Sequence, residues 1–160
     1  MRALRHLAAV LILPGTVTVL IPALLLADAE VAPWPLAAAG SVLLAAGVAM
    51  IAWTVALFAG VGRGTLAPWD PPERLVIRGP YRYVRNPMIS GVLTVLLGEA
   101  ALFGSWAVLG WWATVFAINA VYFVAFEEPD LRDRFGVEYE TYASSVPRWI
   151  PRLPAGRGQA

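Results

Sequence analysis

Long apolar stretches constrain this chain more than any other feature of its sequence. Three of them contain no charged residue, and a fourth contains one acid, Glu99. An α-helix needs about 20 apolar residues to cross the hydrocarbon core of a bilayer. We therefore predict four transmembrane helices, at about residues 7–26, 36–59, 88–103 and 106–126.

The composition supports a membrane protein with one domain. Hydrophobic residues make up 59% of the 160 residues and charged residues only 14%, which is too apolar for an ordinary soluble domain. We predict an all-α integral membrane protein with a single domain, residues 1–160. A polar loop, residues 60–87, and a C-terminal segment, residues 127–160, are expected outside the bilayer. The first apolar stretch follows basic residues as in a signal peptide, but it is too long for a typical one.

All 12 basic residues are arginines, and they fall on one side of the predicted bundle. They lie before the first helix, in the 60–87 loop and after the fourth helix. Of the two opposite loops, one has Asp28 and Glu30 as its only charged residues, and the other consists of Gly104 and Ser105. Because cytoplasmic loops are enriched in basic residues, we expect both termini to be cytoplasmic, in what we take to be a bacterial inner membrane.

The composition also argues against several kinds of function. The chain has no cysteine, and its single histidine, His6, lies among arginines near the N-terminus, so we expect no disulfide and no metal site. The net charge of +1 gives no reason to expect a nucleic-acid partner. The expected surroundings are membrane lipids.

Residues 78–91, R-G-P-Y-R-Y-V-R-N-P-M-I-S-G, form the most informative polar stretch. Asn86 and Pro87 are typical of an N-cap followed by the first residue of a helix. A helix N-terminus with Arg85 beside it favours an anionic group such as a carboxylate or a phosphate. The alternative is that these arginines only contact lipid headgroups.

Two adjacent carboxylates, Glu127 and Glu128, follow the fourth apolar stretch. The partial negative charge of a helix C-terminus makes this pair unfavourable unless a cation approaches it. That cation could be Arg132 or Arg134 nearby, or the ammonium group of a ligand whose carboxylate contacts Arg85. A ligand with both groups would be an amino acid or a molecule that contains one.

Four ordered motifs resemble a known enzyme family. They are G-P-Y-x-x-x-R-N-P-x-x-x-G from Gly79, E-E-P-x-L from Glu127, F-G-x-x-Y-x-x-Y from Phe135 and V-P-R-x-I-P from Val146. Together they are similar to the membrane-embedded methyltransferases related to isoprenylcysteine carboxyl methyltransferase and phospholipid N-methyltransferase, over residues 62–151. The resemblance implies that S-adenosylmethionine binds at the cytoplasmic ends of the last helices. It also implies that residues 60–87 form a cofactor-binding loop and that residues 127–160 form a C-terminal helical cap over the cofactor.

The resemblance also implies which residues form the site. Arg85 and Glu127 are the catalytic candidates, and Tyr139 and Tyr142 could either cover the adenosine or pack on the membrane interface. The chain has Asn86 and Ile89 where the carboxyl methyltransferases usually have histidine and tyrosine, so it matches that branch less well. The cofactor-binding residues carried over by position are Gly79, Pro80, Tyr81, Arg85, Asn86, Pro87, Gly91, Glu127, Glu128 and Tyr139.

The function implied by the resemblance is methyl transfer to a lipophilic acceptor, either an isoprenylcysteine-like carboxylate or a phospholipid amine. Such a transfer needs alignment and exclusion of water rather than a catalytic triad. Arg85 could orient a carboxylate, and a glutamate could take the proton of an amine. The alternatives are an NADPH-dependent membrane reductase of the sterol-reductase type and a non-catalytic membrane scaffold.

Two features remain open at this level. Glu99 is an acid within a predicted span, and such residues are functional candidates by default. The small residues Ala37, Gly40, Ala45 and Gly47 could pack within one monomer or between copies, so the oligomeric state is undetermined.

Overall fold

The computed structural model describes residues 14–57, 75 and 77–151, and all regular elements in these residues are helical. The all-α prediction is thus confirmed for this part of the chain. In order, the elements are η1 (Thr16–Leu20), α2 (Ile21–Leu25), α3 (Trp34–Leu57), η3 (Gly79–Arg82), α4 (Pro87–Phe103), α5 (Trp106–Tyr122), η4 (Phe123–Glu127), α6 (Glu128–Phe135) and α7 (Val137–Ser145).

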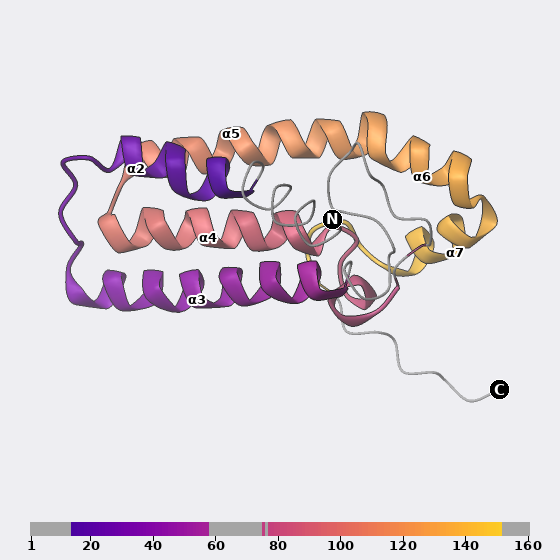
Figure 1. Ribbon diagram of the computed structural model, residues 1–160, viewed down its shortest axis with the longest axis horizontal. Coiled ribbons are helices and arrows are strands. Elements are labelled where there is room, and N and C mark those ends of the chain that lie inside the picture. The colour runs from indigo at the N-terminus through magenta and orange to yellow at the C-terminus, as the bar shows by residue number, and fades with distance from the viewer. Residues whose placement is uncertain (1–13, 58–74, 76, 152–160) are drawn as a thin grey trace, which may run out of the picture.

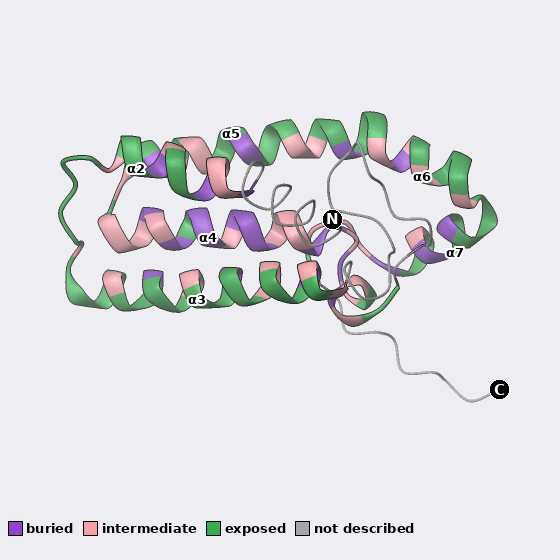
Figure 2. Ribbon diagram, in the orientation of Figure 1, coloured by how far each residue is buried: buried purple, intermediate pink, exposed green. Residues whose placement is uncertain are grey.

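The helices α3, α4 and α5 lie side by side along the length of the molecule, with α2 at one end and α6 and α7 at the other (Figure 1). The buried residues are concentrated on α4, in the middle (Figure 2). Large apolar side chains on the outer helices point outward: Val42 on α3 is 69% exposed and Ile118 on α5 is 61% exposed. An apolar outer surface of this extent is typical of a protein surrounded by lipid.

The described residues contain two helices long and apolar enough to cross a membrane, Trp34–Leu57 and Trp106–Phe135. The prediction of four such helices is therefore confirmed only in part. The third predicted span, α4, has 17 residues, because Pro87 begins it and Gly104 ends it. For the first, the described residues give only the short apolar helix Thr16–Leu25. Residues 7–13, residues 58 and 59 and most of the 60–87 loop lie outside the described residues.

Local chemistry sets both ends of α4. The Asn86 side chain accepts a hydrogen bond from the Ile89 N–H at 3.4 Å, and Pro87 occupies the first turn, as the sequence predicted. At the other end, Gly104 adopts a left-handed conformation (φ 58°), and the Ser105 hydroxyl accepts from the Val108 N–H. A tight hairpin therefore joins α4 to α5.

Four glycines bring α3 and α4 into backbone contact. A Cβ atom added to Gly40 would lie 2.7 Å from the Gly98 carbonyl oxygen, and one added to Gly47 would lie 2.8 Å from that of Gly91. On each helix the two glycines are seven residues apart, so they share one face. We call this contact the glycine seam. It shows that Gly40 and Gly47 pack within the monomer, whereas Ala45 is exposed.

The helix that starts with α5 does not end near residue 126, where the sequence analysis placed the end of the span. A π-helical turn, η4, continues it into α6, and the Glu128 N–H donates to the Phe123 carbonyl. Pro129 lacks an N–H, and its ring crowds the preceding turn, so a wider turn accommodates it. The same arrangement precedes Pro22, where η1 occupies the turn before α2.

The helices α6 and α7 form a cap at one end of the bundle. Gly136 separates them with a φ of 52°, which lets α7 fold back toward the start of α4 (Figure 1). Tyr139, Tyr142 and Val146 form the buried core of the cap, and Leu131 and Phe135 are among the side chains that pack against them. We use the word cap for residues 128–151.

Candidate functional site

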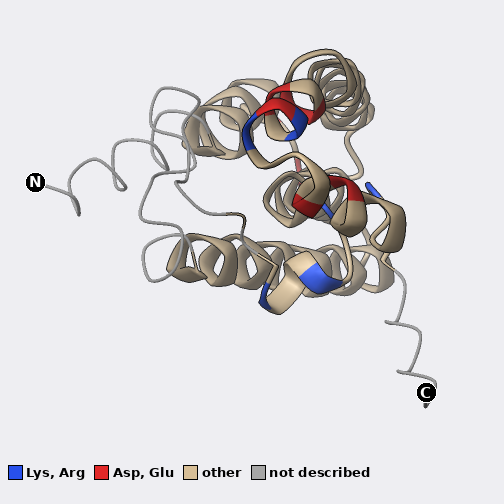
Figure 3. Ribbon diagram, turned by 90° about the vertical axis from the view of Figure 1, so that its right-hand side faces the viewer, with Lys and Arg blue, Asp and Glu red and all other residues tan. Residues whose placement is uncertain are grey.

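Charged side chains gather at the end of the bundle where the cap meets the residues before α4. The view along the bundle from this end shows acidic and basic residues grouped over the ends of the helices (Figure 3). The candidate site comprises residues from three separate regions: Tyr81 and Arg85 before α4, Glu127 and Glu128 after α5, and Tyr139 in α7.

Glu128 is a buried carboxylate surrounded by arginines. Its residue exposure is 1%. Arg85 Nη1 donates to its Oε1 at 2.9 Å, and Arg148 donates through Nε to Oε1 at 2.5 Å and through Nη2 to Oε2 at 2.9 Å. Arg132, one helical turn further on, lies 3.6 Å from Oε2. We call these four residues the Glu128 cluster. A charge removed from water requires such pairing.

The cluster keeps Glu128 ionised. Burial alone would raise the pKa of this carboxyl group, but the hydrogen bond from Arg148 and the positive charges of the cluster outweigh burial and lower the pKa. The apolar part of the helix ends at Phe126, so Glu128 lies beyond the predicted membrane span. Both of its oxygens already accept hydrogen bonds from arginines. The sequence analysis left open whether arginines or the ammonium group of a ligand neutralise the charge of Glu128. The geometry favours the arginines.

Glu127 differs sharply from its neighbour. Its side chain is half-buried, and no hydrogen bond or ion pair connects it to another described residue. It lies close enough to Tyr81 that its negative charge adds to the rise in the pKa of Tyr81, which burial mainly causes and Tyr142 strengthens. Of the two carboxylates, Glu127 is the one available to a ligand.

Two buried donors near the cluster have no partner among the described residues. They are Nε of Arg85 and the hydroxyl of Tyr139. Burial raises the pKa of Tyr139, while the neighbouring guanidinium of Arg85, which can donate to the Tyr139 hydroxyl, acts in the opposite direction. Buried polar groups are almost always hydrogen-bonded in folded proteins, so these two groups either bond to each other after a small movement or bind a ligand or water.

The second tyrosine of the cap has a partner. The Tyr142 hydroxyl donates to the Tyr81 backbone carbonyl at 2.8 Å, and burial raises the pKa of Tyr142. Both Tyr139 and Tyr142 are buried in the cap core. This bond connects α7 directly to the residues before α4, and it holds the cap over the candidate site.

Gly79 and Pro80 have structural roles that need no ligand. Gly79 adopts a φ of 56°, and a Cβ atom there would lie 2.8 Å from the Leu57 side chain. Pro80 is buried within the short helix η3. These two residues shape the turn that precedes Arg85, and direct contact with a cofactor remains a prediction.

Asn86, Pro87 and Gly91 belong to the start of α4. Asn86 and Pro87 form the N-terminus of this helix. Gly91 lies in the glycine seam, where a Cβ atom would meet Ile51 at 2.9 Å. Helix capping and close helix packing explain why these three residues occur at these positions. Their contact with the cofactor stays a prediction.

Arg148 is the residue of this site for which the sequence suggested no role. It follows Glu128 by 20 residues, and its two hydrogen bonds depend on the fold of the cap. The only sequence signal is an arginine within the V-P-R-x-I-P motif. The sequence pointed instead to Arg132 and Arg134, of which Arg134 pairs with Asp130 at 3.3 Å.

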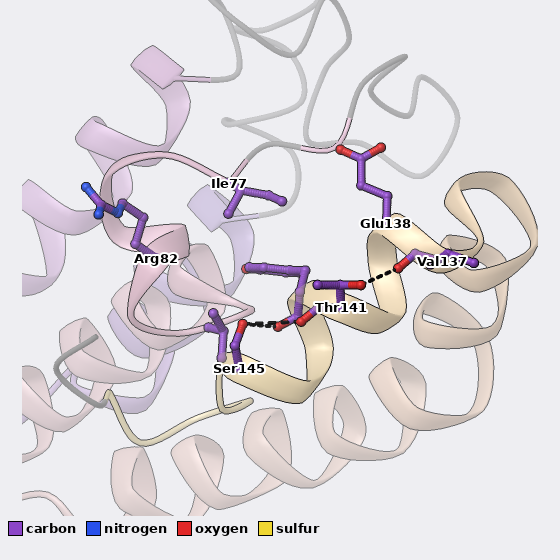
Figure 4. Close-up of a pocket in the computed structure, with 8 residues that line it drawn as sticks. Ile77, Arg82, Val137, Glu138, Thr141 and Ser145 are labelled. Atoms are coloured by element: carbon purple, nitrogen blue, oxygen red, sulfur yellow. Dashed lines mark hydrogen bonds between the residues drawn. The ribbon is translucent and has the colours of Figure 1, made fainter. Parts of the chain in front are cut away.

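A groove of about 530 Å³ lies beside the candidate site. Figure 4 shows it between α7 and the residues around η3. Arg85, Glu127 and Glu128 do not line it, so it neighbours the candidate site without containing the carboxylates. The residues that line it are Ile77, Arg82, Val137, Glu138, Thr141, Tyr142, Ser145 and Val146.

Comparison with known protein families gives a match. A family model described as phospholipid methyltransferase matches residues 36–138, which is more than half of the chain. The matched region includes α3 except its first two residues, all of α4 and α5, Arg85 and both glutamates, and it ends just before Tyr139. No match was found among curated proteins or among solved structures.

Proposed function

This chain belongs to the phospholipid methyltransferase family, and we propose that it transfers a methyl group from S-adenosylmethionine to a lipophilic acceptor in the membrane. The resemblance predicted from the sequence motifs is confirmed by the family match, which also favours a methyltransferase over a reductase or a scaffold. The cofactor and the acceptor are the proposed part. The observation that carries them is that two buried donors, Arg85 Nε and the Tyr139 hydroxyl, and the carboxylate of Glu127 have no hydrogen-bond or ion-pair partner among the described residues.

These groups fit the amino acid end of S-adenosylmethionine. That end carries a carboxylate and an ammonium group on the same carbon. Arg85 would bind the carboxylate through Nε, because its Nη1 is already held by Glu128. Glu127 would bind the ammonium group, and the Tyr139 hydroxyl would contribute a further hydrogen bond. Charge-assisted hydrogen bonds of this kind are about twice as strong as neutral ones.

Once bound, the cofactor supplies a sulfonium methyl group, which is already a strong electrophile. The protein therefore has to align the acceptor and exclude water rather than activate the methyl group. Arg85 and Glu127 would fix the orientation of the cofactor. The buried rings of Tyr139 and Tyr142, held over this end of the bundle, would keep water from the reacting atoms.

The acceptor would reach Glu127 from the surrounding lipid. Tyr122 and Phe126 stack with their ring centroids 5.7 Å apart on the last turns before Glu127. Phe126 is 63% exposed and Tyr122 is 42% exposed. An exposed aromatic pair next to an available carboxylate suits an acceptor that carries its reactive group at the membrane surface.

We also propose that all four predicted helices cross the membrane. Although α4 has only 17 residues, this lies at the lower end of the range for spanning helices. Trp34 and Trp106 are 81% and 83% exposed at the hairpin end of the bundle, as expected for an interfacial aromatic belt. The cap, α6 and α7 included, lies at the opposite end of the bundle (Figure 1), which agrees with the arginine distribution and supports a cytoplasmic site.

A second role for Glu127 applies if the acceptor is a phospholipid amine. An amine that gains a methyl group must lose a proton, and a half-buried carboxylate could accept it. The arginines of the Glu128 cluster all contact Glu128, which leaves fewer partners for a carboxylate acceptor. The geometry thus favours the amine over the isoprenylcysteine-like carboxylate.

The test begins with calorimetric binding of S-adenosylhomocysteine to the detergent-purified protein. We expect saturable binding that Glu127→Gln and Arg85→Ala each weaken by about tenfold or more, because each removes a charged hydrogen-bond partner. Glu138→Gln, on the groove, serves as the control and should bind normally. Absence of binding by folded wild-type protein would refute the proposed cofactor.

Transfer of a labelled methyl group then distinguishes the acceptors and the roles of Glu127. Phosphatidylethanolamine vesicles and an isoprenylcysteine probe are offered separately, and we expect label in the amine lipid. If Glu127 binds the ammonium group, Glu127→Gln weakens cofactor affinity. If Glu127 accepts the proton, the affinity stays unchanged, and kcat falls and loses its dependence on pH.

A further inference from the structure

The residues that follow α7 connect the cap to two regions distant in sequence. Val146 is buried with Tyr139 and Tyr142 in the cap core. The carbonyl of Pro147 accepts a hydrogen bond from the backbone N–H of Arg85 at 2.9 Å. The chain therefore passes directly from the core of the cap to the residue that precedes the Asn86 N-cap of α4.

The next two residues extend this connection. The guanidinium of Arg148 holds both oxygens of Glu128. The ring of Trp149 meets the edge of Phe116 with centroids 5.6 Å apart, and it lies 5.8 Å from the ring of Phe123. We call residues 146–149 the strap, because each of its four residues contacts a different region. Val146 packs in the cap core, Pro147 binds the residue before Asn86, Arg148 binds Glu128 at the start of α6, and Trp149 contacts rings on α5 and η4.

The strap holds Arg85 at two points. Its backbone N–H is bound by Pro147, and its Nη1 is bound by Glu128, which Arg148 holds in turn. Arg148 grips Glu128 through two parallel hydrogen bonds, a geometry that fixes orientation as well as distance. Nε of Arg85 stays buried without a partner among the described residues.

Stability alone is a poor explanation for this arrangement. Replacing a buried ion pair by apolar residues of similar volume often leaves a protein equally stable or more stable, because desolvation offsets the attraction between the charges. A network of charged hydrogen bonds, by contrast, determines the orientation of each member. The side chain whose orientation matters most for the proposed chemistry is Arg85.

We propose that Arg148 is a positioning residue, which acts through Glu128 to orient Arg85 toward the cofactor, and that the strap must be in place for the cofactor to bind tightly. This proposal rests on the proposed function. It gives Glu128 a supporting role instead of the direct contact with the cofactor that the sequence resemblance implied.

Calorimetry with S-adenosylhomocysteine tests the positioning role. Arg148→Gln should raise Kd by about tenfold, since it removes both hydrogen bonds to Glu128, and Arg148→Lys should restore part of the loss. Arg134→Gln, on the same cap, should leave Kd within about twofold. The double variant Glu128→Gln/Arg148→Gln should bind no more weakly than the weaker single variant. A merely structural role would lower Tm and leave the Kd of folded protein unchanged, and that result would overturn the proposal.

Trypsin cleavage after Arg148 tests the strap without the cofactor. In wild-type protein the grip on Glu128 should protect this bond. Arg148→Lys keeps a cleavage site and the charge but loses the two-point grip, so mass spectrometry should detect cleavage about tenfold faster. Cleavage at the wild-type rate in Arg148→Lys would refute the strap. Protection in wild-type protein that binds no S-adenosylhomocysteine would refute the proposed function and leave the strap standing.

Discussion

The glycine seam and the Glu128 cluster join parts of this molecule by opposite means. In the seam, α3 and α4 touch through their backbones because four side chains are absent. In the cluster, the cap is joined to the residues before α4 by a carboxylate and three arginines. The hydrophobic effect does not drive helices together inside a bilayer, because lipid tails are as apolar as the side chains. Close packing of the helices must drive their association instead. At the membrane surface, charges can be paired. The seam should therefore fail when atoms are added, and the cluster when a charge is lost.

The largest effect should come from removing the central charge of the cluster. Glu128→Gln leaves three arginines around a neutral side chain, and we expect a loss of about 3 kcal/mol, near the lower end for a broken buried ion pair because Arg148 is 40% exposed. Thermal or denaturant unfolding in detergent measures it. The matched control is Asp130→Asn, whose carboxylate is 62% exposed and pairs with Arg134. That pair should contribute less than about 0.5 kcal/mol. Equal effects of the two changes would contradict the assigned role of the cluster.

A single methyl group should damage the seam. In Gly98→Ala the new Cβ atom would lie 2.7 Å from the Leu44 backbone nitrogen, so the helices must separate. We expect a loss of about 2 kcal/mol from overpacking. Gly110→Ala on α5 meets nothing within 4 Å and should be neutral or should stabilise the helix by up to about 1 kcal/mol. Thermal unfolding of both variants side by side measures the difference, and a tolerated Gly98→Ala would disprove the close contact.

Acid should weaken the cluster and spare the seam. The folded-state pKa of Glu128 is lowered, so its stabilisation is complete above the unfolded pKa of about 4.3. It declines as the pH falls below that value and is lost once the pH passes through the lowered folded pKa. The difference in free energy of unfolding between wild type and Glu128→Gln should therefore shrink below about pH 4. The difference for Gly98→Ala should not change over this range. A wild-type-to-Glu128→Gln difference independent of pH would rule out the charged role of Glu128.

The smallest effect should come from the outermost member of the cluster. Arg132 lies 3.6 Å from Glu128 and is 48% exposed. Arg132→Gln should cost less than about 0.5 kcal/mol, and added salt should abolish the difference. Unfolding at low and high ionic strength tests this. A cost as large as that of Glu128→Gln would mean that the stabilisation from each contact does not follow its distance and exposure.

Local chemistry explains which parts of the fold could be predicted from the sequence. Asn86 and Pro87 marked the start of α4, and Gly104 and Ser105 marked its end, because a helix cap depends only on neighbouring residues. The family motifs also predicted that Arg85 and Glu127 belong to one cofactor site, and this stays a prediction. The prediction of four spans rested on the apolar stretches and on the placement of the arginines. Because α4 has only 17 residues between Asn86 and Gly104, it is shorter than the two described helices that are long enough to cross a membrane.

Tertiary contacts explain what the sequence left undetermined. Arg132 and Arg134 lie near Glu128 in sequence, yet the closest contacts come from Arg85 and Arg148, which lie 43 and 20 residues away. The seven-residue spacing of the glycines was visible, but it could not show whether Gly40 and Gly47 faced α4 or a second copy. Glu127 and Glu128 differ because the fold of the cap brings Arg148 to Glu128. The spacing of residues in the sequence does not predict that fold.

The widened turn η4 sets the direction in which every later side chain points. Such a turn contains one residue more than an α-helical turn, and each residue of a helix advances the side-chain direction by about 100°. In an uninterrupted α-helix the additional residue would turn every later side chain, including that of Glu128, by about 100°. The wider turn absorbs this residue, so Glu128 keeps the direction that brings it to Arg85. The site therefore depends on the shape of one helical turn as well as on the identities of the charged residues.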